Sequence, residues 1–188
     1  SRDNLRTWEF VVVADPDEYG IGFSESDIVR LDSGRLLAIY GNNSNSEFFW
    51  RTYSDDEGRT WAPMKQLTFP GDSPSMVKLS GDALLAAFRH KPEDGGSKGV
   101  GLVASADGGE TWDVLGNILD QTSYDMAYPD LIKLADGKIL CVYYTAPDSI
   151  LIPPEQEAEL EKIEPMNTLY RGPSGLPAAR RRTTKLRP

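Results

Sequence analysis

The stretch SADGGETW, Ser105–Trp112, occurs earlier in the chain as SDDEGRTW, Ser54–Trp61, and in degenerate form as SRDNLRTW, Ser1–Trp8. An Asp at the third place of such a turn can accept hydrogen bonds from backbone N–H groups just ahead of it. A Gly at the fifth place can take the positive φ that the turn requires. The sequence therefore predicts a repeated tight β-turn whose Trp anchors it to a core. The structural residues predicted for the three turns are Ser1, Asp3 and Trp8; Ser54, Asp56, Gly58 and Trp61; and Ser105, Asp107, Gly109 and Trp112.

The spacing of the turns indicates a repeated sheet. Ser1 and Ser54 are 53 residues apart and Ser54 and Ser105 are 51 apart, a period in the range of β-propeller blades. A second repeat lies between the turns: VRLDSGRLLAIYG from Val29, VKLSGDALLAAFR from Val77 and IKLADGKILCVYY from Ile132 align without a gap. Each reads as an apolar strand, a polar turn and a second apolar strand.

These repeats predict two full four-stranded antiparallel blades and parts of two others. A ring of six blades needs about 300 residues, so we expect a piece of a larger propeller, or a partial ring completed by self-association. The strands are expected at 27–31, 35–40, 48–53 and 61–67; at 75–79, 83–88, 99–104 and 112–119; at 130–134 and 138–144; and, as the outer strand of an incomplete blade, at 8–13.

The C-terminal part is expected to stand apart from the propeller fragment, with the boundary between residues 1–148 and 149–188. The run PPEQEAELEKIEP, Pro153–Pro165, predicts a short helix, with Pro at its start and acidic residues in its first turn. The rest, rich in Pro, Gly and Arg, predicts a disordered tail.

The composition narrows the possible partners. The net charge of -9 and the isoelectric point of about 4.7 argue against nucleic acid. The five basic residues of the last eleven favour a solvated tail over a binding site. One Cys and one His cannot assemble a zinc site, and we expect no metal and no cofactor. Cys141, in an apolar run, is expected to be a buried thiol. No apolar run approaches the ~20 residues that cross a bilayer.

The SxDxGxTW turn resembles the Asp-box, and with the repeated strand pairs it makes residues 1 to about 148 similar to the sialidases and their bacterial neuraminidase-repeat (BNR) relatives. The resemblance implies an all-β fold, a six-bladed β-propeller of which this chain is a part. It favours secretion or the periplasm. Similar turns also occur in non-catalytic propellers of the sortilin type, so the turn by itself does not imply activity.

The order of strands in a blade separates the turns from any active site. The SxDxGxTW turns join third to fourth strands and lie on one face, so Asp56 and Asp107 are expected to be structural rather than catalytic. The opposite face receives the residues just before the first strands and just after the second strands. The gapless alignment identifies these as Glu25, Ser73, Tyr128, Gly41, Arg89 and Tyr144, and we expect them to share one mouth near the propeller axis.

The resemblance to sialidases implies a particular chemistry at this mouth. Sialidases attack the sugar with a tyrosine, because a neutral phenol is not repelled by the carboxylate that their substrate carries, and a glutamate takes the proton. SESDIVRLDSGRLL matches the family's glutamate context at Glu25, and AYPDL matches its tyrosine context at Tyr128. The resemblance thus implies Tyr128 as nucleophile and Glu25 as its base. Arg89, Lys98 and Tyr144 are predicted to contact the substrate.

Two departures keep the function open. Sialidases hold the substrate carboxylate with three arginines, whereas Gly41 and Lys98 stand at two of the expected places. The prediction is an exo-glycoside hydrolase that acts on terminal sialic acid or a related acidic sugar; the alternative is a non-catalytic propeller that binds a glycan or a protein. Each residue also has a structural alternative: Tyr128 packing over a neighbouring blade, Glu25 solvated in a loop, and Arg89 in a salt bridge at a loop base.

Overall fold

The computed structural model describes residues 1, 3–42, 48–90, 98–121, 127–144 and 182–185. The strands form three antiparallel sheets, in the orders β1-β2-β3-β4, β5-β6-β7-β8 and β11-β10-β9. The elements are α1 (Pro16–Tyr19), β1 (Phe23–Arg30), β2 (Leu36–Asn42), β3 (Phe48–Ser54), β4 (Lys65–Pro70), β5 (Asp72–Lys78), β6 (Leu84–His90), β7 (Lys98–Ser105), β8 (Asp113–Gln121), β9 (Ala127–Lys133), β10 (Ile139–Tyr144) and β11 (Arg182–Lys185).

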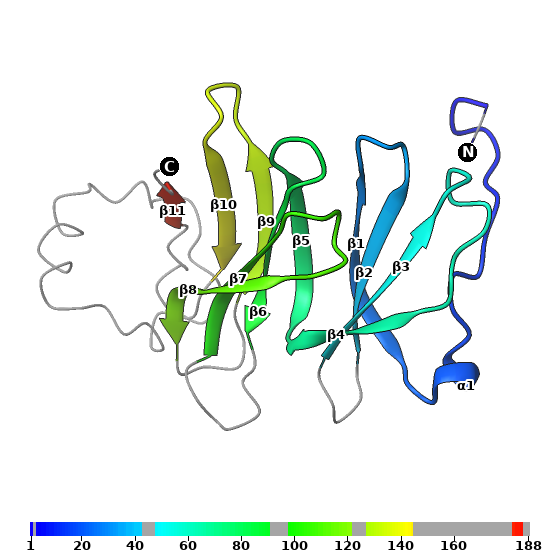
Figure 1. The fold of residues 1–188 in the computed structure, drawn as a ribbon, viewed down its shortest axis with the longest axis horizontal. Coiled ribbons are helices and arrows are strands. Elements are labelled where there is room, and N and C mark those ends of the chain that lie inside the picture. The colour runs from blue at the N-terminus through cyan, green and yellow to red at the C-terminus, as the bar shows by residue number, and fades with distance from the viewer. Residues whose placement is uncertain (2, 43–47, 91–97, 122–126, 145–181, 186–188) are drawn as a thin grey trace, which may run out of the picture.

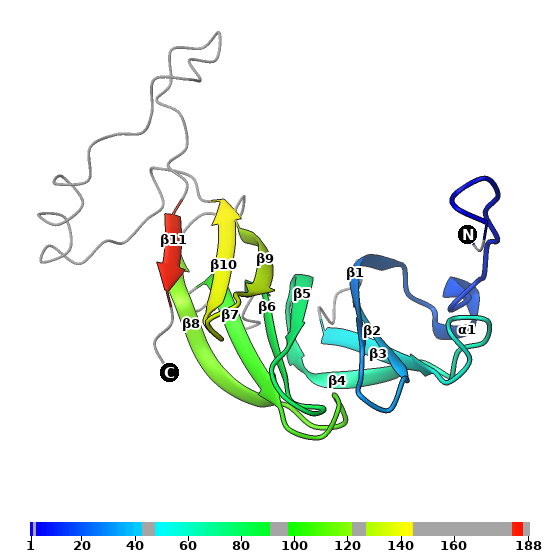
Figure 2. The same cartoon turned by 90° about the horizontal axis from the view of Figure 1, so that it is seen from above.

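The sheets are arranged as successive blades. Here they are called blade 1 (β1–β4), blade 2 (β5–β8) and blade 3 (β9–β11). Figures 1 and 2 show them following one another along an open arc, with the N-terminal segment at one end and blade 3 at the other. The prediction of an all-β partial propeller with two complete four-stranded blades is confirmed.

The first two strands of every blade are joined by the same hairpin, as the second repeat predicted. The N–H of Leu31 donates to the carbonyl of Arg35 at 2.9 Å, and equivalent bonds close the hairpins after Leu79 and Leu134 at 2.8 and 2.7 Å. Gly34, near the end of the first hairpin turn, has φ of 89°, which only glycine adopts without strain. The repeated sequence therefore builds a repeated strand register.

The core lies in two layers between the blades, and β6 belongs to both. Leu84 and Phe88 of β6 pack in the layer between blades 1 and 2, where Phe88 meets Phe49 edge to face with ring centroids 5.4 Å apart. Leu85 and Ala87 of β6 pack in the layer between blades 2 and 3. A strand buried on both faces needs apolar residues at every position, which explains the uninterrupted run LLAAF.

The second layer also contains the one cysteine of the chain. Cys141 is 1% exposed, and its burial raises the pKa of the thiol to about 11. The predicted buried thiol is confirmed.

Three segments differ from the prediction. Residues 8–13 were expected to form a strand, but they form none and pair with none of the three described sheets. The segment after them contains the short helix α1, capped by Asp15, which the repeats did not predict. Residues 182–185, expected to be disordered, pair with β10 as β11. The helix predicted at 153–165 lies outside the described residues.

The SxDxGxTW turns are fixed by their own side chains. The hydroxyl of Ser105 accepts a hydrogen bond from the N–H of Gly109 at 2.9 Å and donates to Asp107 at 2.8 Å. Asp107 accepts in turn from the N–H and the hydroxyl of Thr111, at 2.9 and 2.6 Å. The copy that begins at Ser54 repeats these bonds. Each turn is therefore complete without any ligand.

The tryptophans of the turns are not equivalent. Trp112 donates from Nε1 to the carbonyl of Gly109 at 3.1 Å and packs against Phe69, with ring centroids 5.9 Å apart. Trp61 makes the same bond within its own turn. Trp8 is 63% exposed, so the prediction that it anchors the first turn is wrong for this chain. The Ser1–Trp8 turn keeps its Asp3–Thr7 bonds, but its tryptophan joins neither buried layer of the described residues.

Replacing the turn glycines separates backbone strain from packing. Gly58 and Gly109 have φ of 83° and 89°, so alanine at either place costs roughly 1 to 2 kcal/mol. A Cβ at Gly109 would also lie 2.5 Å from Leu37 Cδ2, whereas none comes closer than 3.7 Å at Gly58. We expect Gly109→Ala to lower the free energy of unfolding by about 1 to 3 kcal/mol more than Gly58→Ala. Urea unfolding of both variants measures the difference, and equal losses would contradict the packing argument.

The turn aspartates predict an acid-dependent stability. The backbone N–H of Thr60, followed by its hydroxyl, lowers the pKa of Asp56 from 3.8 to about 2. A carboxylate with a depressed folded-state pKa stabilises the fold above pH 4, and that contribution is lost as the pH falls towards 2. We expect Asp56→Asn to be less stable than the wild type at pH 6 and the two to converge near pH 2. Chemical unfolding measured at both pH values tests this, and a constant difference would contradict it.

Candidate active site

Glu25 and Tyr128 meet although 103 residues separate them. Glu25 lies near the start of β1 and Tyr128 near the start of β9, and the Tyr128 hydroxyl donates to Glu25 Oε1 at 2.7 Å. Tyr128 as a residue is 47% exposed, so the pair lies at the surface of the described chain. The structure thus brings blades 1 and 3 together at the mouth that the alignment predicted.

The hydrogen bond has an electrostatic consequence. The bond from Tyr128 lowers the pKa of Glu25 from 4.5 to about 2, against the partial burial that acts to raise it. Glu25 is therefore ionised near neutral pH and accepts, rather than donates, in this pair. A carboxylate in contact with a phenol hydroxyl is positioned to remove its proton.

Arg89 and Tyr144 lie against the ring of Tyr128. The guanidinium carbon of Arg89 is 4.4 Å from the centroid of that ring, and the ring of Tyr144 stacks on it at 5.9 Å with an angle of 19° between planes. A guanidinium over an aromatic face is attracted by the ring quadrupole. Three of the residues assigned to the site therefore form one cluster around the tyrosine.

Asp72 lies at the mouth, although the sequence alone did not predict it there. It pairs with Arg89 in the β5–β6 register, and its Oδ2 lies 3.8 Å from Arg89 Nη1. A Cβ at Gly41 would lie 2.6 Å from Asp72 Oδ1 and 2.7 Å from the hydroxyl of Ser24. The place where the family resemblance puts an arginine is thus bordered by a carboxylate. The sequence position of Asp72 could have indicated this, because Asp72 directly precedes Ser73, which the alignment places at the mouth.

The strands are bent where their side chains reach the mouth. Ser73 and Tyr128 both have positive φ, 51° and 40°, and the register of each strand pair breaks beside them. A bulge of this kind changes the direction of a side chain at the cost of local strain. The hydroxyl of Ser73 is buried and makes no hydrogen bond within the part of the chain that the structure describes.

Lys98 begins β7, but its side chain lies outside the described residues, so its assigned contact with the substrate stays a prediction. No group of three or more His, Cys, Asp or Glu side chains in the described ranges is arranged to hold a metal ion. None of the described helices is long and apolar enough to span a membrane.

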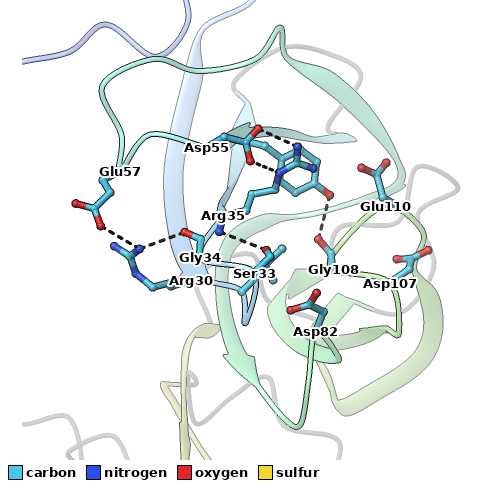
Figure 3. Close-up of a pocket in the computed structure, with 12 residues that line it drawn as sticks. Arg30, Ser33, Gly34, Arg35, Asp55, Glu57, Asp82, Asp107, Gly108 and Glu110 are labelled. Carbon is cyan, nitrogen blue, oxygen red and sulfur yellow. Dashed lines mark hydrogen bonds and ion pairs between the residues drawn. The ribbon is translucent and has the colours of Figure 1, made fainter.

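A cavity of about 580 Å³ lies at the opposite end of the blades, beside the SxDxGxTW turns (Figure 3). Its charged groups are largely paired with one another: Arg35 binds Asp55 through two nitrogens at 2.7 and 2.9 Å, and Arg30 lies 3.5 Å from Glu57. The Tyr53 hydroxyl donates across it to the carbonyl of Gly108 at 3.0 Å. These contacts join the turns of blades 1 and 2, and we interpret the cavity as structural.

The sequence has a recognisable family. Residues 1–141 match the BNR repeat-like domain. The chain belongs to this family. The match covers blades 1 and 2, β9 and the start of β10, and agrees with the BNR relationship inferred from the turns. No curated protein sequence matches the chain.

Solved structures share the arrangement of this BNR-repeat chain. A protein of unknown function from Dyadobacter fermentans superposes with a TM-score of 0.64 at 22% identity over 78% of this chain and 40% of its own. An alpha-L-arabinanase from Penicillium chrysogenum, complexed with arabinobiose, gives 0.50 at 24% over 67% and 42%. An alpha-L-arabinofuranosidase from Fusarium graminearum, complexed with an iminosugar inhibitor, gives 0.53 at 19% over 65% and 40%. The chain spans about two fifths of the length of these proteins, which show its fold.

The Asp72–Arg89 pair predicts a non-additive loss of stability. The two side chains are only 9% and 12% exposed, so Arg89→Gln leaves a carboxylate buried without its cation, at a cost of about 3 kcal/mol. The double variant Asp72→Asn/Arg89→Gln removes both charges, and we expect it to be more stable than Arg89→Gln. Urea unfolding of the two single variants and the double variant gives the coupling. Additive losses would show that the pair does not interact.

Proposed function

We propose that Tyr128 and Glu25 form the nucleophile and base of a glycoside hydrolase. The observation that carries the proposal is the 2.7 Å hydrogen bond between them. The pairing supplies what a tyrosine nucleophile needs, an adjacent ionised carboxylate that takes the phenol proton. Membership of the BNR repeat-like domain family and the glycosidases among the structures of similar fold support the same class of reaction.

The proposed reaction proceeds in two steps. Tyr128 Oη attacks the anomeric carbon while its proton passes to Glu25, and the bond to the leaving oxygen breaks as a general acid, which we assign to no described residue, protonates that oxygen. Water then attacks the anomeric carbon from the side that the leaving group vacated and gives its proton to the conjugate base of the general acid, while the bond from the sugar to Tyr128 Oη breaks and Glu25 returns its proton to that oxygen. Two displacements retain the configuration at the anomeric carbon.

The proposed substrate is a terminal sialic acid or a related acidic sugar. A neutral phenol suits a reacting carbon that carries a carboxylate, because an anionic nucleophile would be repelled. Arg89 supplies a guanidinium at the mouth, held beside Tyr128 by the ring contact, for binding the substrate carboxylate.

A second candidate is a propeller that binds a glycan or a protein without cleaving it. The crowding at Gly41 favours it, because Asp72 and Ser24 leave no room there for the arginine of a sialidase. In this reading Tyr128, Tyr144 and Arg89 form an aromatic and cationic contact surface, and the Glu25 bond only orients the Tyr128 ring.

Hydrolysis of fluorogenic glycosides by the full-length protein decides between the two. The panel contains an aryl alpha-sialoside and, because two structures of similar fold are enzymes named for arabinose linkages, an aryl alpha-L-arabinofuranoside. We expect Tyr128→Phe to reduce turnover to background and Glu25→Gln to reduce it roughly 10²- to 10⁴-fold. Tyr144→Phe is the comparison variant: it keeps the stacked ring of a residue assigned to substrate contact rather than bond making, so we expect turnover to persist in it where Tyr128→Phe abolishes turnover.

The two candidate functions predict different results, provided that circular dichroism shows all variants to be folded. Full activity of Tyr128→Phe would exclude the nucleophile role. Absence of turnover by the wild type on every glycoside, with binding of the same sugars in calorimetry, would establish the second candidate instead.

A further inference from the structure

The carboxylate of Asp72 is held in one position between blades 1 and 2. Asp72, at the start of β5, is 6% exposed. Its Oδ1 accepts the N–H of Ser73 at 2.9 Å and the hydroxyl of Ser24, in β1, at 3.3 Å. Its Oδ2 lies 3.8 Å from Nη1 of Arg89, near the end of β6. Contacts within β5 and with both neighbouring strands therefore fix where this negative charge lies.

The charge lies beside Gly41, where the resemblance to sialidases puts an arginine. A Cβ at Gly41 would meet Asp72 Oδ1 at 2.6 Å, the Ser24 hydroxyl at 2.7 Å and the carbonyl oxygen of Glu25 at 3.5 Å. Asp72 is thus close to the backbone of Glu25. At this point of the mouth the chain has a negative charge in place of the positive charge that the resemblance implies.

The described charges at the mouth do not favour an anion. Glu25 and Asp72 each bring a carboxylate, and Arg89 brings a guanidinium. A sugar carboxylate that enters the mouth is attracted by Arg89 and repelled by the two carboxylates. The repulsion from Glu25 is inherent in its proposed role as the base, whereas Asp72 has no such role. Asp72 is therefore the charge that can be removed to test the balance.

Arg89 has its guanidinium between two groups of the protein. Its carbon lies 4.4 Å from the centroid of the Tyr128 ring, and its Nη1 faces Asp72. The side chain is 12% exposed, so little of its surface is open to a ligand. A guanidinium binds a carboxylate best through two parallel hydrogen bonds. A substrate carboxylate must therefore compete with Asp72 for Arg89.

We propose that Asp72 is a specificity-determining residue of the mouth, which weakens the preference for a sugar that carries a carboxylate. Its charge pairs with Arg89 and repels a second anion beside it. An acidic sugar binds through Arg89, but less tightly than it would without Asp72, and a neutral sugar is not excluded. The inference rests on the proposed function for the position of the sugar beside Tyr128. It does not depend on cleavage of the glycosidic bond.

The test compares two ligands that differ in one charge. N-acetylneuraminic acid and its methyl ester are titrated into the full-length protein, and calorimetry gives the ratio of their affinities. Neither ligand contains a glycosidic bond, so binding is measured whether or not the protein is an enzyme. We expect Asp72→Asn to raise the acid-to-ester ratio roughly 10-fold, because one repelling charge is removed, and Arg89→Gln to lower it by a similar factor.

Two further variants separate the local charge from other effects. Asp72→Asn keeps an oxygen that can accept from Ser24 and Ser73. Asp72→Ser introduces the residue that stands at the equivalent place in blade 1, and we expect it to raise the ratio as well. Asp55→Asn is the matched control, because Asp55 also pairs with an arginine, Arg35, but at the opposite end of the blades. We expect it to leave the ratio unchanged.

Circular dichroism verifies that the variants are folded. A ratio that is unchanged or lowered in the folded Asp72 variants overturns the inference. An equal rise in Asp55→Asn also overturns it, because the effect would then come from the net charge of the protein. Failure of every protein to bind either sugar overturns it as well. The expected ratios in a protein that hydrolyses no glycoside support the inference, and they establish binding in place of the proposed hydrolysis.

Discussion

The stacking of one sheet upon the next is the contact on which the rest of this structure depends. Four-stranded sheets with apolar residues on both sides cannot remain in water alone, and β6 shows this most directly, with Leu84 in one layer and Leu85 in the other. The stacking bends the row of sheets into an arc. The arc in turn brings the starts of β1 and β9 close enough for Tyr128 to donate to Glu25. The candidate site is therefore a product of blade packing rather than of any local motif.

The repeats made much of this arrangement predictable. Because three strand pairs align without a gap, a position in one blade has a spatial counterpart in the next, and Glu25 and Tyr128 could be assigned to one mouth before their distance was known. The turns were predictable for a different reason, since the Ser, Asp and Thr side chains of each turn bond to one another and to the backbone of the same turn.

The features that the sequence did not predict are those that do not recur in the repeats. The Asp72 carboxylate matches Ser24 in the preceding blade, so periodicity gave no warning that it would pair with Arg89 and border Gly41. Trp8 occupies the same place in its turn as Trp61 and Trp112, but it is exposed and joins neither buried layer of the described residues. The pairing of residues 182–185 with β10 brings together segments with no sequence similarity. Each of these depends on a contact between distant, unrelated stretches, which composition and spacing do not encode.

The burial of Cys141 makes the packing between blades 2 and 3 observable by chemistry. Its sulfur lies in the layer that those blades share, and the pKa of about 11 keeps it a thiol rather than a reactive thiolate at neutral pH. Alkylation requires the layer to open first. Because the chain has one cysteine, the rate at which an alkylating reagent modifies it measures how often blades 2 and 3 separate. No residue has to be introduced for this measurement.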